Sequence, residues 1–186
     1  MDPGAELRAR DALLDRIRRY ADEHGLYALT LENLAAVLAM PLDALEEFFG
    51  SKEDLIVALV ARNRIRLREK FANLDSSAPS DEFRRVMWAY YLETAADSRL
   101  FFEAYGLALH DEHYAEFLHG INDWIGLLKE ALERRGVARD RAEAFATLSL
   151  AVFRGAMLDY CATNERARVN AAMELWFKAA NWLTEP

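Results

Sequence analysis

The sequence predicts an all-α protein with a small head of three short helices on a larger helical body, about nine helices in total. Apolar residues recur at the spacing of one helix face along most of the chain. Only four prolines and eight glycines interrupt its 186 residues, so long helices can form. No segment alternates polar and apolar residues in the way that predicts a half-buried strand.

The head has clear start and stop signals. Its predicted helices cover residues 5–24, 31–38 and 41–49. Gly25 follows the first helix as a natural stop, and Thr30 has the side chain of an N-cap for the second. Pro41 suits the first turn of the third helix, and Gly50 ends it. We therefore place a domain boundary after residue 50, with the body at residues 51–186.

The body begins with Ser51 to Asp54, which resembles a capping box that opens a long helix. The predicted body helices cover residues 52–73, 80–96, 100–109, 114–135, 139–162 and 166–183. The segment 75–80 is polar, which predicts a linker. The helix after it is apolar on nearly every side from Phe83 to Ala96, which predicts that it is buried.

The last two predicted helices are apolar on two faces each. One face can fill the chain's own core, and the other needs a partner. Pairing both helices with their copies in a four-helix bundle would cover this second face, so we expect a homodimer through the last two helices.

The composition favours a cytoplasmic protein. Cys161 is the single cysteine, which fits a reducing compartment and excludes an internal disulfide. The most apolar run, Leu148 to Leu158, contains Arg154, so we expect no membrane span. Met1 to Gly4 lack the apolar run of a signal peptide.

Three short helices followed by a long one, with a tight turn from Ala39 to Pro41, describe a helix-turn-helix head. The segments Gly25 to Ala35 and Phe48 to Leu55, with Leu45 between them, resemble the signature of the TetR family of one-component regulators. The order of the later helices is similar to that family over the whole chain. The segment Arg154 to Thr163 resembles the dimerisation region of many of its members.

The resemblance implies a ligand-responsive transcriptional regulator, most often a repressor, that binds double-stranded operator DNA as a homodimer. Its third helices would enter successive major grooves about 34–36 Å apart. By position in the motif, Thr30 and Lys52 would contact phosphates. The exposed face of the third helix would carry the other DNA-facing residues, namely Leu42, Asp43, Ala44, Glu46 and Glu47.

The third helix departs from the family pattern in its charge. The family usually has glycine at the position of Ala39, tyrosine at Glu46 and often a basic group at Glu47. Residues 1–56 contain six Lys and Arg against twelve Asp and Glu, a net charge of −6. Because phosphate contacts supply much of the affinity for DNA, two functions remain open. The head either binds operator DNA or belongs to a ligand-binding or protein-binding module that has lost DNA binding.

The body is rich in aromatic side chains. A pocket between its helices would suit a small apolar or aromatic effector, while the same side chains, taken one by one, also fit an ordinary core. The candidate ligand-binding residues are Trp88, Tyr91, Phe102, Tyr105, Trp124, Phe153, Met157 and Tyr160.

Other chemistry has little support in the sequence. His110, His113 and His119 lie close together, but a histidine-rich stretch without cysteines favours a surface segment over a metal site. There is no glycine-rich phosphate loop and no nucleophile elbow. We therefore predict that the protein is not an enzyme and uses no metal or other cofactor.

Overall fold

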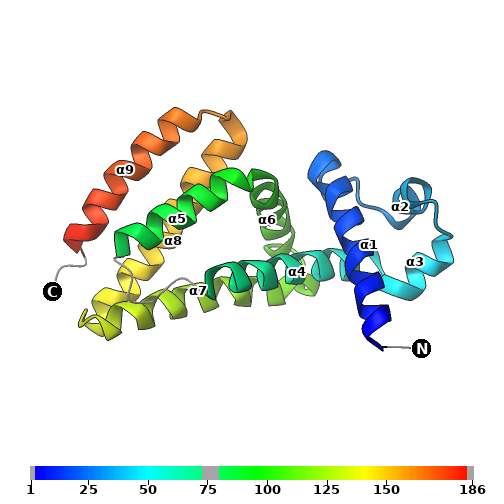
Figure 1. The fold of residues 1–186 in the computed structure, drawn as a ribbon, viewed down its shortest axis with the longest axis horizontal. Helices are drawn as coiled ribbons and strands as arrows, with labels where there is room; N and C mark the ends of the chain where they lie inside the picture. Colours follow the sequence, from blue (N-terminus) through cyan, green and yellow to red (C-terminus); the bar gives the residue numbers. More distant parts are fainter. Residues whose placement is uncertain (1–2, 73–79, 184–186) are drawn as a thin grey trace. The chain divides into compact units, whose positions relative to one another are not determined.

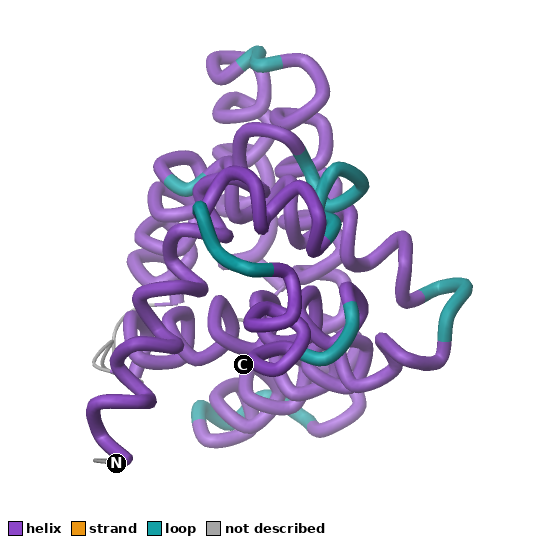
Figure 2. The backbone as a smooth tube through the Cα atoms, turned by 90° about the vertical axis from the view of Figure 1, so that its right-hand side faces the viewer, coloured by secondary structure: helices purple, strands orange, loops and turns teal. Residues whose placement is uncertain are grey.

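The computed structural model describes residues 3–72 and 80–183. Within these ranges every regular element is a helix, and no strand is present (Figure 2). The predicted all-α class is confirmed. The predicted linker, residues 75–80, lies outside the described ranges except for Ser80.

The chain divides into two compact units, residues 1–66 with 99–117 and residues 67–98 with 118–186. The first unit contains the whole helix-turn-helix segment. Its helices in Figure 1 are α1 (Pro3–His24), α2 (Leu31–Leu38) and α3 (Leu42–Phe49), followed by the first part of α4 (Lys52–Ala72), most of α6 (Ala95–Ala108) and the short 3-10 turn η1 (Glu112–Tyr114). Its fully buried side chains include Ile17, Leu34, Leu45 and Ile56.

The caps of α2 and α3 form the turn between these helices. Thr30 Oγ1 accepts a hydrogen bond from the amide of Asn33 at 3.2 Å, as an N-cap does. Ala39 ends α2 in the left-handed conformation with φ +53°, which glycine adopts without strain and alanine does not. Pro41 is the N-cap of α3 rather than its first helical residue, which is Leu42. The expectation for Pro41 was therefore wrong by one residue.

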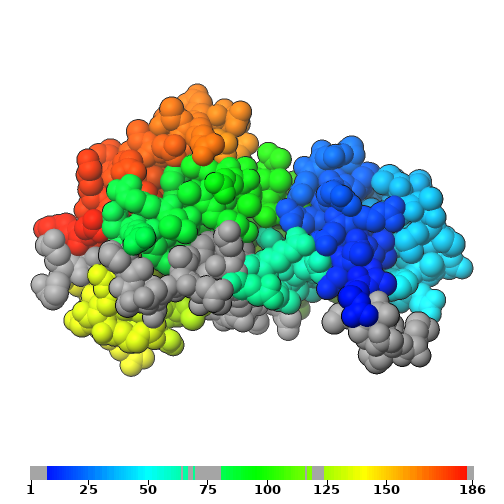
Figure 3. Space-filling model, viewed as in Figure 1, coloured from blue at the N-terminus to red at the C-terminus, as the bar shows by residue number. Residues whose placement is uncertain are grey.

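The second unit is built on an antiparallel pair of long helices, α8 (Arg139–Thr163) and α9 (Arg166–Leu183), joined at Asn164. Most of α5 (Ser80–Glu93) packs against both, and α5 and α9 lie side by side in Figure 3. The later part of α7 (Ala115–Arg134) completes the unit. Phe145 stacks on Trp176 with ring centroids 5.8 Å apart, over a core of Leu132, Val137, Ala142 and Ala180.

Two expectations for this region were wrong in detail. The helix predicted for residues 80–96 ends at Glu93, and α6 starts at Ala95 rather than at residue 100. Thr94 marks the break, where both its amide and its hydroxyl donate to the carbonyl of Tyr90, at 3.0 and 2.9 Å. Helix α5 is also not buried on all sides, because Val86 is exposed while Met87 and Trp88 are buried.

Helix α8 is long and apolar enough to cross a membrane by length and composition, with a mean hydropathy of 1.2 over its most apolar window. This differs from the expectation that Arg154 excludes a membrane span. In the structure α8 contributes Phe145, Phe153 and Met157 to the core of the second unit, and core helices of folded domains often have such a composition.

Candidate functional site

The outward face of α3 is the first candidate site. Leu45 and Phe49 point into the core, which leaves Leu42, Asp43, Glu46 and Glu47 exposed and Ala44 half-buried. The structure therefore gathers the five predicted third-helix residues on or beside one surface. Among the described residues of α3 there is no Lys or Arg, so this surface is acidic.

The two residues predicted to contact phosphates lie at the ends of neighbouring helices. Thr30 uses its hydroxyl to cap α2. Lys52, at the start of α4, donates from Nζ to the carbonyl of Tyr27 at 3.2 Å and lies 5.8 Å from the centroid of the Tyr27 ring. Because a lysine ammonium group has three N–H donors, Lys52 can keep this partner and still contact a phosphate.

Two other cations of the head region are committed to internal ion pairs. Arg62 of α4 bonds both Asp11 and Asp15 of α1, and Arg66 also bonds Asp15. Burial alone would raise the pKa of Asp15, but hydrogen bonds and charges from the two arginines outweigh it and lower the pKa below its usual value. These arginines therefore hold α1 against α4 and do not offset the acidic charge of α3.

The head also exposes apolar side chains that were not predicted as site residues. Val37 of α2 is 56% exposed, and Phe48 of α3 is 40% exposed beside Glu47. Phe48 was not identified because its neighbour Phe49 has the same side chain and is buried. Which of the two phenylalanines is buried depends only on the rotation of α3 about its axis.

The predicted effector residues fall in both units. In the second unit Phe153 contacts Trp88 and Tyr91 with ring centroids 6.2 and 6.4 Å away, and Met157 is buried one turn along α8. Trp88 Nε1 donates to Asn170 Oδ1 at 2.8 Å. Burial raises the pKa of Tyr91 to about 12. Trp124 and Tyr160 are half-buried in the same unit.

Phe102 and Tyr105 belong to a second aromatic cluster, in the first unit. Phe101 is its centre, with ring centroids 5.3 Å from Phe102, 6.1 Å from Tyr105 and 5.2 Å from Phe117. Phe102 and Tyr105 were predicted from the sequence, but Phe117, which lies on the next helix, α7, was not.

Two contacts in the first unit connect α6 to the head and η1 to the start of α4. The carboxylate of Glu103 accepts a hydrogen bond from the amide of Leu26 at 2.5 Å, and His113 Nε2 lies 3.1 Å from Asp54 Oδ1. His113 is therefore in contact with a carboxylate rather than in a metal cluster. Over the residues that the structure describes, which exclude the side chain of His119, no group of His, Cys, Asp or Glu is arranged to hold a metal ion.

The outer face of α8 and α9 is apolar. Leu175 and Trp182 of α9 are 69% and 71% exposed, and Leu148 and Leu158 of α8 are also exposed. The second apolar face predicted for the last two helices is thus present on the surface of the chain.

The fold is similar to that of several solved bacterial regulators. GusR of Salmonella enterica is 22% identical with a TM-score of 0.73, over 99% of this chain and 94% of GusR. A TetR-family transcriptional regulator of Agrobacterium tumefaciens is 21% identical with a TM-score of 0.75, over 91% and 96% of the two chains. The fatty acid degradation regulator FadR of Bacillus halodurans is 16% identical with a TM-score of 0.69, over 94% and 93%.

These similarities show that the chain has the fold of TetR-family regulators over nearly its whole length. No protein-family model and no curated protein matches the sequence itself.

Proposed function

We propose that this chain is a TetR-type transcriptional regulator of the cytoplasm, a binding protein rather than an enzyme, that acts on operator DNA as a homodimer. The turn between α2 and α3 carries the proposal. Thr30 caps α2, Ala39 takes the left-handed conformation, and α3 presents a continuous exposed face beyond them. This is the arrangement that lets a second helix enter a major groove while the first crosses the backbone.

The acidic face of α3 sets the expected strength of binding. Each phosphate contact by a cation contributes about −0.9 to the slope of log affinity against log salt. Lys52 is the one cationic contact predicted on each head, and Arg62 and Arg66 form ion pairs with α1. We therefore expect modest affinity and a shallow slope, roughly −2 to −4 for the dimer.

The body would provide the dimer contact and the effector site. The exposed apolar face of α8 and α9 supports pairing with a second copy, because an apolar surface of this kind is unfavourable in water. The aromatic clusters around Phe153 and Phe101 support a small apolar or aromatic effector, with the eight body residues named from the sequence as the first candidates.

A second function is favoured by one observation on the head. Phe48 exposes apolar surface next to Glu47 on α3, and Val37 exposes more on α2, which packs against α3. Apolar surface with carboxylates suits a basic protein partner better than a phosphate backbone. In this alternative, the head binds a protein and no longer binds DNA.

The two functions are separated by fluorescence anisotropy with the purified full chain. The probes are a duplex from the DNA that flanks its own gene and a shuffled duplex of equal length, at 50–200 mM salt. Selective binding that weakens with salt supports the regulator. Equal binding to both duplexes, or none at the lowest salt, contradicts it and favours the protein-binding head.

A double variant, Glu46→Tyr with Glu47→His, measures what the acidic face costs. Removing two carboxylates per head from the DNA surface should strengthen operator binding severalfold, whereas Glu93→Gln, an exposed carboxylate on α5, should leave it unchanged. Weaker binding by the double variant would instead mean that these glutamates accept hydrogen bonds from cytosine amino groups.

A further inference from the structure

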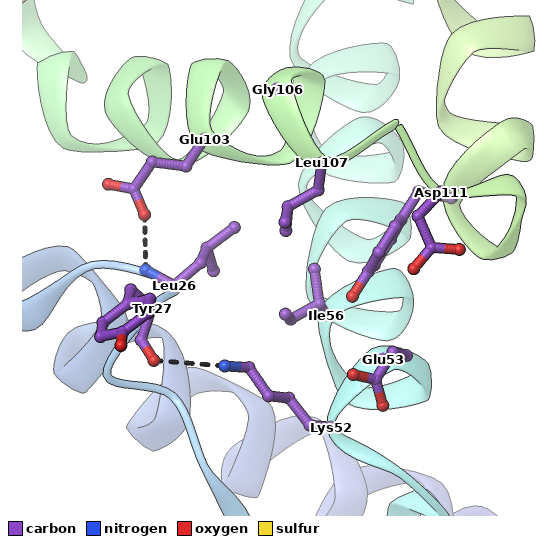
Figure 4. Close-up of a pocket in the computed structure, with 10 residues that line it drawn as sticks. Leu26, Tyr27, Lys52, Glu53, Ile56, Glu103, Gly106, Leu107 and Asp111 are labelled. Atoms are coloured by element: carbon purple, nitrogen blue, oxygen red, sulfur yellow. Dashed lines mark hydrogen bonds between the residues drawn. The ribbon is translucent and has the colours of Figure 1, made fainter. Parts of the chain in front are cut away.

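A cavity of about 420 Å³ opens within the first unit, at a place that the proposed effector residues do not occupy (Figure 4). The loop between α1 and α2, the start of α4, the end of α6 and η1 enclose it. The lining residues are Leu26, Tyr27, Lys52, Glu53, Ile56, Glu103, Gly106, Leu107, Asp111 and Tyr114. This volume lies at the lower end of the range for small-molecule sites.

The charge of the lining is negative. Glu53, Glu103 and Asp111 bring three carboxylates, against the single ammonium group of Lys52. The Lys52 ammonium group donates a hydrogen bond to the Tyr27 carbonyl and lies over the Tyr27 ring. The walls between these groups are apolar, because Leu26 and Ile56 are buried side chains and Leu107 lies opposite them. The cavity therefore attracts a cation that also has hydrocarbon surface.

Two polar groups of the lining have no partner in the chain. Among the residues that the structure describes, Glu53 makes no hydrogen bond or ion pair, although its side chain is half-buried. Tyr114 is only 5% exposed, and its hydroxyl likewise has no hydrogen bond within the described part of the chain. Burial raises the pKa of Tyr114, and the charges of Glu53 and Asp111 raise it further, so the hydroxyl lies in the field of these carboxylates.

The Tyr114 hydroxyl lines the cavity without a partner in the described part of the chain, so a ligand can bond it without breaking an internal hydrogen bond. The phenol oxygen can accept from an N–H group, and Glu53 can accept another. The remaining carboxylates are already engaged, since Glu103 accepts from the Leu26 amide and Asp111 from the His113 amide at 2.8 Å. These two carboxylates add negative charge to the site while they keep their internal hydrogen bonds.

A bare metal ion does not fit this lining. Over the residues that the structure describes, no three carboxylate, histidine or cysteine groups stand close enough to bind one ion together. An anion would face a net charge of −2 from the lining side chains. An organic ammonium group can donate separate hydrogen bonds to single acceptors of the lining, and its carbon chain can pack on the apolar wall.

We propose that this cavity binds a small aliphatic amine, with the ammonium group held between Glu53 and the Tyr114 hydroxyl. The bound amine contacts the loop before α2 and the start of α4 on one side and η1 on the other. It therefore fixes the position of the head within the first unit. An effect of the amine on DNA binding rests on the proposed function, but binding itself does not.

The test is isothermal titration of the full chain, without DNA, at constant ionic strength. The probes are n-butylamine and 1,4-diaminobutane, with n-butanol and butyrate as neutral and anionic matches of the same length. We expect one saturable site per chain for the amines and much weaker heat from butanol and butyrate. Equal binding of butanol, or binding of the amines that does not saturate, overturns the proposal.

Three variants locate the site. Glu53→Gln should weaken butylamine binding about fivefold to tenfold, and Tyr114→Phe, which removes only the hydroxyl, about threefold to tenfold. Glu93→Gln removes an exposed carboxylate of the second unit and should change nothing. An unchanged affinity in both cavity variants would mean that the amines bind elsewhere on the protein. An equal loss in Glu93→Gln would mean that they respond only to the net charge of the protein. Either result overturns the proposal.

Discussion

The carboxylate of Glu103 in α6 accepts a hydrogen bond from the backbone amide of Leu26, 77 residues earlier in the chain. Leu26 is buried in the loop that precedes α2, and the neighbouring Gly25 has φ +77° and leaves little room, since an added Cβ would lie 3.2 Å from the same carboxylate. One side chain of α6 therefore fixes the loop that leads into the helix-turn-helix segment.

Replacing Glu103 tests the strength of this connection. Glu103→Ala leaves the buried Leu26 amide without an acceptor and should lower the free energy of unfolding by about 1 kcal/mol, reduced from the value for a buried group because Glu103 is exposed. Glu103→Gln keeps an acceptor oxygen and should lose about half as much. Urea denaturation measures both. If the two variants lose the same amount, the amide bond is not the source of the effect.

Asp54 gives a prediction for acid stability. Its pKa is lowered from the ordinary value of 3.8, first by the hydrogen bond from the Ser51 hydroxyl at 2.7 Å, then by the Ser51 amide, and to a lesser degree by His113. A lowered folded-state pKa means that the stabilisation is present above about pH 4 and is lost as the pH falls through the folded value. In acid, α4 should therefore lose the half of its capping box that the Asp54 carboxylate supplies, while the Ser51 hydroxyl oxygen still accepts from the Asp54 amide.

The denaturation midpoint of the wild type and of Asp54→Asn should be compared between pH 6 and pH 3. The difference between them should be largest near neutral pH and should shrink as the pH falls. Ser51→Ala removes the main cause of the shift and should reproduce most of this behaviour. A difference that stays constant with pH would show that the Asp54 charge contributes nothing.

The capping box at Ser51 and Asp54 shows which features the sequence could predict. The side chain of each residue accepts a hydrogen bond from the backbone amide of the other, three residues away. The motif is therefore local and can be recognised in the sequence. The order of the helices and the two-faced character of α8 and α9 were predictable for the same reason, because periodicity is also local.

Contacts between distant segments were not predictable. Arg84, near the start of α5, is charged and would be expected on the surface. In the structure it is only 6% exposed and donates a hydrogen bond to Asn181 of α9. Burial chiefly lowers the pKa of Arg84 to about 10. The cavity around Glu53 and Tyr114 likewise draws on four segments whose approach depends on tertiary packing. Contacts of this kind have no local signal in the sequence.

Ala39 gives a prediction on stability that needs no ligand. Alanine at φ +53° is strained by about 1 kcal/mol relative to glycine, and part of the gain from glycine is offset by the greater freedom of the unfolded chain. Ala39→Gly should therefore stabilise the protein by roughly 0.5 kcal/mol. Ala36→Gly, three residues earlier on the exposed side of α2, should destabilise it by about 1 kcal/mol. Equal losses in both variants would contradict a strained turn at Ala39.

The exposed face of α8 and α9 leads to a prediction on assembly. Leu158 and Leu175 lie on the outer side of the two helices and would each be buried twice in a two-fold dimer. Leu158→Glu with Leu175→Glu should raise the dimer dissociation constant at least 100-fold, because the lost apolar burial and the added charges act in both copies. Sedimentation equilibrium over a range of concentrations measures the change.

Leu127→Glu is the matched control for this variant. Leu127 lies on α7 and is 48% exposed, close to the 52% of Leu158, but it is not on either of the last two helices. Its substitution should leave the dimer intact and the circular dichroism spectrum unchanged. If Leu127→Glu separates the subunits and the double variant does not, the two-fold contact is formed by α7 instead. A wild-type chain that stays monomeric at every concentration would contradict the homodimer itself.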